Sequence, residues 1–67
     1  MNYHIVSTPD GWNLQAEGFE AALLAAPTKA RLLELLSEYM DGRTGSVKIY
    51  TETGKIEDER TYPRTHF

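Results

Sequence analysis

Residues 27–42, PTKARLLELLSEYMDG, decide the fold, because they combine a sustained helical period with a clear signal at each end. Pro27 lacks an N–H and its ring clashes with a preceding helical turn, so the helix is predicted to begin at Thr28, a good N-cap residue. Gly42 suits the left-handed conformation just past a helix end. One apolar stripe follows the helical spacing and comprises Leu32, Leu35, Leu36, Tyr39 and Met40. This stripe has to be buried against the flanking segments.

The segments that precede this helix have the two-residue period of β-strands. Residues 3–8 are rich in β-favouring side chains, and residues 11–17 alternate between apolar and polar. Between them, Thr8-Pro9-Asp10-Gly11 fits a type I turn. The apolar face of the second segment comprises Trp12, Leu14 and Ala16. These patterns predict a hairpin with one buried face.

Residues 18–26, GFEAALLAA, admit three interpretations. They are rich in helix formers, which favours a short helical turn or an extension of the helix kinked at Pro27. The third interpretation is a short strand, in which Ala22 and Leu24 face opposite to Leu23. A residue before proline avoids the α region, so a break near Ala26 favours the strand.

After the helix, residues 46–51 alternate again, residues 52–55 form a tight reversal, and residues 55–62 return as a last strand. Ile56 is expected to share a face with the apolar residues of the preceding strand. Alternation puts the charged Asp58 and Arg60 on the same face, so the far half of this strand is predicted to leave the core or to lie on an edge. Pro63 is expected to end it before a mobile tail, residues 64–67. The predicted buried set is Trp12, Leu14, Leu32, Leu36, Tyr39, Met40, Val47, Ile49 and Ile56.

The predicted fold class is therefore α+β in one domain, residues 1–67. It has a small antiparallel or mixed β-sheet of four to five strands in the order β-β-(β)-α-β-β, with one helix packed on one face.

Several short motifs carry a resemblance to a known family. They are Tyr3-His4-Ile5-Val6, Gly11-Trp12, Thr28-Lys29-Ala30 and the run GSVKIY…GKIEDERTYPR over residues 45–64. With these motifs the chain resembles the domain-of-unknown-function 2188 family of small bacterial and phage-associated proteins. Arg31 departs from the family pattern, in which an acidic residue often follows Thr-Lys-Ala. The resemblance implies a compact α+β domain, and it implies no mechanism and no catalytic residue.

Charge and composition argue against several classes of function. The net charge is −3 and no block of the chain is basic, which argues against nucleic-acid binding, since that binding depends on cations that neutralise phosphates. The chain has no cysteine, so neither disulfides nor thiolate metal ligands are available, and a cytoplasmic location is expected. No apolar run approaches the roughly 20 residues of a membrane span, so no membrane association is expected.

The candidate catalytic and metal-binding residues are few. His4 and His66 are the candidates for acid–base catalysis, and they lie at opposite ends of the chain without a nucleophile nearby. Consecutive side chains on a strand alternate between faces, so the acids of Glu57-Asp58-Glu59 do not all converge on one cation. We therefore expect a protein that is not an enzyme and that has no metal or other cofactor.

The function predicted from sequence is a small, non-catalytic protein-interaction or accessory domain. A disulfide-free chain of 67 residues has little stability to spare, which favours a homodimer, and another protein is a possible partner. The alternatives are a nucleic-acid-binding module that uses the open face of the sheet, or a small enzyme. Arginine and aromatic side chains are enriched at binding hot spots, and a polar face with an aromatic residue suits a partner. The predicted partner-binding residues are Arg60, Tyr62, Pro63, Arg64, Tyr50 and Lys48.

Overall fold

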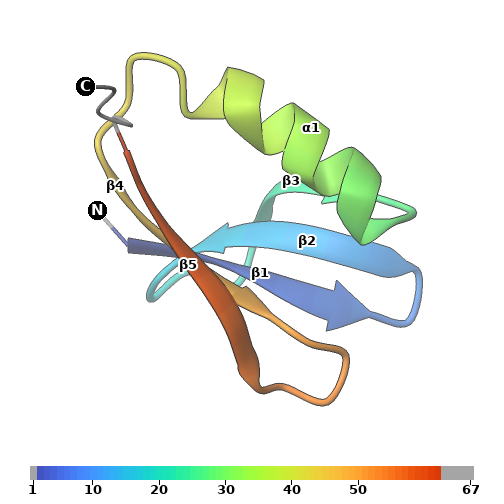
Figure 1. Cartoon of the computed structure of the whole chain (residues 1–67). Coiled ribbons are helices and arrows are strands. Elements are labelled where there is room, and N and C mark those ends of the chain that lie inside the picture. The colour runs from blue at the N-terminus through green and yellow to red at the C-terminus, as the bar shows by residue number, and fades with distance from the viewer. Residues whose placement is uncertain (1, 63–67) are drawn as a thin grey trace.

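The computed structural model describes residues 2–62 of the chain and has the predicted α+β architecture (Figure 1). The expected end at Pro63 and the expected tail lie outside the described residues. The elements are β1 (Asn2–Thr8), β2 (Gly11–Ala16), β3 (Ala22–Ala26), α1 (Lys29–Tyr39), β4 (Gly45–Tyr50) and β5 (Ile56–Tyr62).

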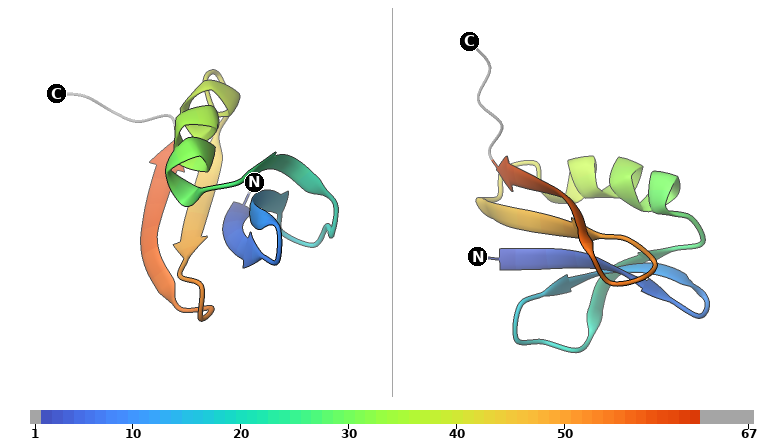
Figure 2. Two further views of the ribbon diagram at one scale, coloured as in Figure 1. Left: turned by 90° about the vertical axis from the view of Figure 1, so that its right-hand side faces the viewer. Right: turned by 60° about the horizontal axis from the view of Figure 1, so that its bottom comes forward.

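The five strands form one mixed sheet in the order β3-β2-β1-β4-β5. Strand β4 pairs parallel with β1, and the other neighbours pair antiparallel. The sheet is strongly twisted between its β4–β5 end and its β1–β2–β3 end, and α1 lies over one face (Figure 2). Strands β3 and β5 are consequently the two edges. The far half of the last strand lies on an edge, as one of the two predicted alternatives had it, but it does not leave the core, since Tyr62 is buried there.

Helix α1 has the predicted ends. Thr28 is the N-cap, with an extended backbone (φ −131°, ψ 154°), and its Oγ1 accepts a hydrogen bond from the Arg31 N–H at 3.2 Å. Arg31 pairs with Glu34 at 3.2 Å, and the first turn contains no acidic residue, so the cap is not reciprocal. Gly42 adopts φ +78° just beyond the helix, which is the left-handed conformation expected there.

Of the three interpretations of residues 18–26, the strand is confirmed. Ala26 is buried and pairs with Trp12 of β2, immediately before Pro27 turns the chain into α1. The β2–β3 register pairs Leu14 with Leu24 but Gln15 with Ala22, so Leu23 is an extra residue that has no counterpart on β2. Ala22 and Leu24 therefore lie on opposite faces of the sheet, and the prediction that they share a face is wrong, because the extra residue breaks the alternation. Leu23 therefore stays largely outside the core.

The core lies between α1 and the sheet face that it covers. Leu32, Leu36 and Met40 of the predicted stripe are buried, and Leu35 and Tyr39 pack against the core at its edge. The buried residues of the described chain are Tyr3, Ile5, Leu14, Ala16, Ala26, Leu32, Leu36, Met40, Val47, Ile49 and Tyr62.

Three residues of the predicted buried set are placed differently. Ile56 is 60% exposed, because the β4–β5 register pairs Ile49 with Asp58 but Tyr50 with Ile56. Glu57 is therefore an extra residue, and it moves Ile56 to the face that the helix does not cover. Trp12 and Tyr39 are half-buried at opposite ends of the helix–sheet interface rather than fully buried.

Candidate interaction surfaces

The structure does not bring the predicted partner-binding residues together on one surface. Lys48 and Tyr50 lie on the uncovered face of β4, since they alternate with the buried Val47 and Ile49. Arg60 of β5 pairs with Val47 and therefore lies on the helix-covered face, as does Tyr62 two residues later. The predicted residues Pro63 and Arg64 fall outside the described residues.

Arg60 and Tyr62 take part in the packing of the domain itself. Tyr62 is 9% exposed and lies opposite Gly45, which leaves room for its ring. Arg60 Nε lies 3.9 Å from Asp58 Oδ2, and this nitrogen is buried without a hydrogen-bond partner within residues 2–62. The two side chains thus close the core along β5.

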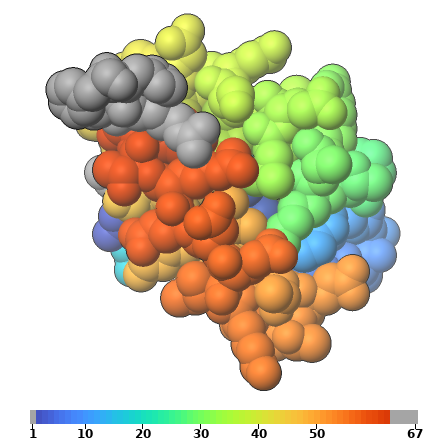
Figure 3. Space-filling model, viewed as in Figure 1, coloured from blue at the N-terminus to red at the C-terminus, as the bar shows by residue number. Residues whose placement is uncertain are grey.

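The β5 edge is an exposed strand whose outer side has no neighbouring strand in the sheet (Figure 3). Lys29 at the start of α1 forms an ion pair with Glu57, which ties the helix to this edge. Strand β5 contains three acidic residues and one arginine, namely Glu57, Asp58, Glu59 and Arg60. Charge of one predominant sign on an edge strand opposes pairing with a second copy of the same strand.

The uncovered sheet face is polar with an aromatic centre. His4 and Tyr50 lie side by side on β1 and β4 with ring centroids 6.2 Å apart, in an edge-to-face arrangement. The half-buried Asn13, Gln15 and Lys48 surround them, as the alternation of the sequence predicts. Among the described residues, this face has hydrogen-bonding groups and one large exposed apolar side chain, Ile56.

The end of α1, the β2–β3 hairpin and Tyr3 of β1 line an open hollow of about 380 Å³, which we name the Phe19 pocket. Two large apolar side chains at its rim are strongly exposed, Phe19 at 63% and Leu23 at 41%. The pocket is lined by Tyr3, Ala16, Phe19, Ala21, Leu23, Tyr39 and Arg43. Almost all of this lining is apolar or aromatic, so the pocket suits an apolar side chain.

The aromatic wall of the Phe19 pocket is held by several contacts. The rings of Tyr3 and Tyr39 meet edge to face, with centroids 6.4 Å apart and planes at 86°. The guanidinium carbon of Arg43 lies 4.3 Å from the centroid of the Tyr39 ring, and its Nε donates to the Tyr39 carbonyl oxygen at 2.8 Å. Arg43 is thereby fixed at the rim as a cation beside an apolar hollow.

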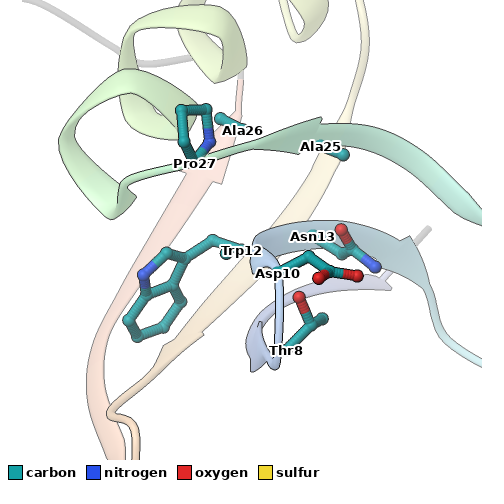
Figure 4. A pocket seen from close by; sticks show the side chains of 8 residues that line it. Thr8, Asp10, Trp12, Asn13, Ala25, Ala26 and Pro27 are labelled. Carbon is teal, nitrogen blue, oxygen red and sulfur yellow. The ribbon is translucent and has the colours of Figure 1, made fainter.

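A second cavity, of about 310 Å³, lies at the other end of the helix (Figure 4). The indole of Trp12 and the carboxylate of Asp10 extend in different directions there, so they do not converge on one point. Lys29 Nζ lies over the Trp12 ring, 4.8 Å from its centroid, so the lysine side chain covers part of the half-buried indole. This cavity is lined by Thr8, Asp10, Gly11, Trp12, Asn13, Ala25, Ala26 and Pro27.

Within residues 2–62, no group of three or more histidine, aspartate or glutamate side chains is placed to hold a metal ion. His4 packs against Tyr50 on the uncovered face of the sheet. Glu57 instead pairs with Lys29 of α1, which lies over the other face. Over the same residues, no helix has the length and hydropathy of a membrane span.

The sequence interpretation did not identify the residues of the Phe19 pocket as a site. Phe19 and Leu23 come from residues 18–26, for which the sequence admits three interpretations. Tyr39 is a residue of the predicted buried set. The regular alternation of a strand with Leu24 facing inward would turn Leu23 towards the uncovered face. The extra residue in β3 instead places Leu23 beside Tyr3 and Ala16, so no signal in the sequence indicated its place in the pocket. Nothing in the sequence placed Arg43 beside this segment.

The comparisons with known proteins identify a family and no activity. A family model described as "Uncharacterized protein conserved in bacteria (DUF2188)" matches residues 3–62, which confirms the resemblance predicted from the sequence. No curated protein and no solved structure matches the chain.

Proposed function

This chain belongs to the DUF2188 family of uncharacterized proteins conserved in bacteria, and we propose that it is a small, non-catalytic protein-interaction domain that self-associates. The observation that supports this proposal best is the pair of exposed apolar side chains, Phe19 and Leu23, at the rim of an apolar cavity. Apolar side chains grouped around a hollow are typical of interaction sites, whereas scattered ones are ordinary.

The size of the chain supports self-association. A domain of about 60 residues buries only about 60% of the surface that its unfolded chain exposes, so its stability is small. Fully burying a leucine or phenylalanine side chain contributes about 1.5–3 kcal/mol, and Phe19 keeps most of its surface exposed in the monomer. Contact with a second copy would therefore stabilise the fold by mass action.

Sedimentation equilibrium of the full chain tests this function. Over roughly 10–500 µM we expect the weight-average mass to rise towards twice the 7.6 kDa of the chain. A mass that stays at the monomer value across this range would contradict self-association. The Phe19 pocket would then be a site for a different protein.

A second candidate function is single-stranded nucleic-acid binding on the uncovered sheet face. It is favoured by the half-buried His4–Tyr50 pair, because bases stack on aromatic rings, and by the adjacent Lys48. The net charge of −3 opposes it. Titration of labelled single-stranded DNA and RNA at about 50 mM salt should show no saturable binding below tens of micromolar. Tighter binding would favour this function over protein interaction.

A further inference from the structure

Phe19 lines the Phe19 pocket and is 63% exposed, so one surface of the chain carries both an apolar side chain open to a partner and a hollow that can receive one. We propose that two copies of this chain pack here around a two-fold axis, with Phe19 of each copy inserted in the Phe19 pocket of the other; this inference rests on the proposed self-association. A two-fold contact uses the same patch on both copies, so the patch must be complementary to itself. An exposed Phe19 beside a pocket that can receive a phenylalanine ring meets that requirement.

The protruding residue is held in position before any contact forms. The Phe19 N–H donates to the Ala16 carbonyl oxygen at 3.1 Å, and Gln15 Nε2 donates to the Glu20 carbonyl oxygen at 3.1 Å. These bonds fix the backbone on both sides of the Phe19 ring, which lowers the entropy lost when the ring inserts. The edge-to-face pair of Tyr3 and Tyr39 supplies an aromatic wall against which a further ring can pack.

The charges around the pocket are also self-complementary. Arg43 is fixed at the rim by its contacts with Tyr39, and Glu20 directly follows Phe19 in the hairpin. Residues 2–26 contain no lysine or arginine, so the hairpin presents acids to a partner and the end of α1 presents a cation. Insertion of Phe19 brings Glu20 to the Arg43 of the other copy, and the two-fold axis repeats this contact.

The first experiment compares two equally exposed apolar residues on different faces. Phe19 is 63% exposed and Ile56 is 60% exposed, so neither substitution opens a cavity in the core. By sedimentation equilibrium, Phe19→Ser should raise the dimer Kd about tenfold or more, while Ile56→Ser should change it by less than about twofold. An unchanged Kd for Phe19→Ser, or equal effects of both substitutions, would overturn this surface.

The second experiment mixes two charge variants. Glu20→Arg places two arginines together in its homodimer, and Arg43→Glu places two glutamates together, so each variant alone should dimerise about tenfold more weakly. In the mixed heterodimer both contacts again join an acid to a base. Native mass spectrometry of the equimolar mixture should therefore show heterodimer in excess of either homodimer, which requires both variants to be folded.

The outcomes separate this surface from self-association as such. If the parent chain is monomeric at several hundred micromolar, self-association and this dimer surface both fail. If the parent dimerises but Phe19→Ser does not weaken it and the mixture forms no heterodimer, this surface fails and self-association stands. Weakening by Ile56→Ser in that case would point to the uncovered face or the β5 edge.

Discussion

At the scale of the residue, Gly11 is the position where the backbone leaves no room for a side chain. It has φ +147° at the start of β2, and a Cβ placed there would lie 2.3 Å from the carbonyl oxygen of Ala26. This close approach lets β3 pair with β2 just before Pro27 turns the chain into the helix. Gly18, at φ +87°, has open space where its Cβ would be.

We predict that Gly11→Ala destabilises the domain by roughly 2–4 kcal/mol, because it adds a collision with backbone to an unfavourable φ. Gly18→Ala is the matched control, since it carries the backbone cost alone, about 1–2 kcal/mol. Urea denaturation followed by far-UV circular dichroism measures both. Equal losses of stability would show that the approach of Ala26 to Gly11 is not a constraint.

At the scale of the element, α1 depends on its N-cap and on one apolar face. The Thr28 hydroxyl satisfies the Arg31 N–H, and no reciprocal side chain supports this cap. The far end closes with the Arg43 side chain bonded to the Tyr39 carbonyl oxygen, so a rim residue of the Phe19 pocket is also part of the helix end.

Thr28→Ala should lower the free energy of unfolding by about 0.5–2 kcal/mol, since it removes the hydroxyl that accepts from Arg31. Ser37→Ala, at an exposed position inside the same helix, should instead raise stability slightly, by up to about 0.5 kcal/mol, because alanine is the better helix former. Differential scanning fluorimetry compares the two. Changes of the same sign would be inconsistent with this account of the cap.

At the scale of the whole molecule, the small core and the exposed Phe19 pocket make the dependence of stability on protein concentration a test of the proposed self-association. If folding and dimerisation are coupled, dilution favours the unfolded chain. We predict that the Tm rises by several degrees over about a hundredfold increase in protein concentration, as measured by scanning calorimetry. A Tm independent of concentration over that range would mean that the monomer is stable by itself.

The sequence alone determined the elements whose signals are local. The apolar spacing from Leu32 to Met40, with Thr28 before it and Gly42 after it, specified the helix, because periodicity and caps act within a few residues. The alternation through Leu14 and the turn at Pro9-Asp10 specified the hairpin in the same way. Ala26 before Pro27 favoured the third strand, since proline restricts the residue before it.

Only the tertiary structure decided the strand register and the candidate site. One extra residue, Glu57, moved Ile56 out of the core and left Asp58 and Arg60 on the covered face. This happens because a one-residue shift in a strand reverses the face of every residue beyond it. The Phe19 pocket joins the β2–β3 hairpin to the end of α1, about 20 residues later in the chain. Such a surface depends on how distant elements pack together, and no local pattern in the sequence encodes that packing.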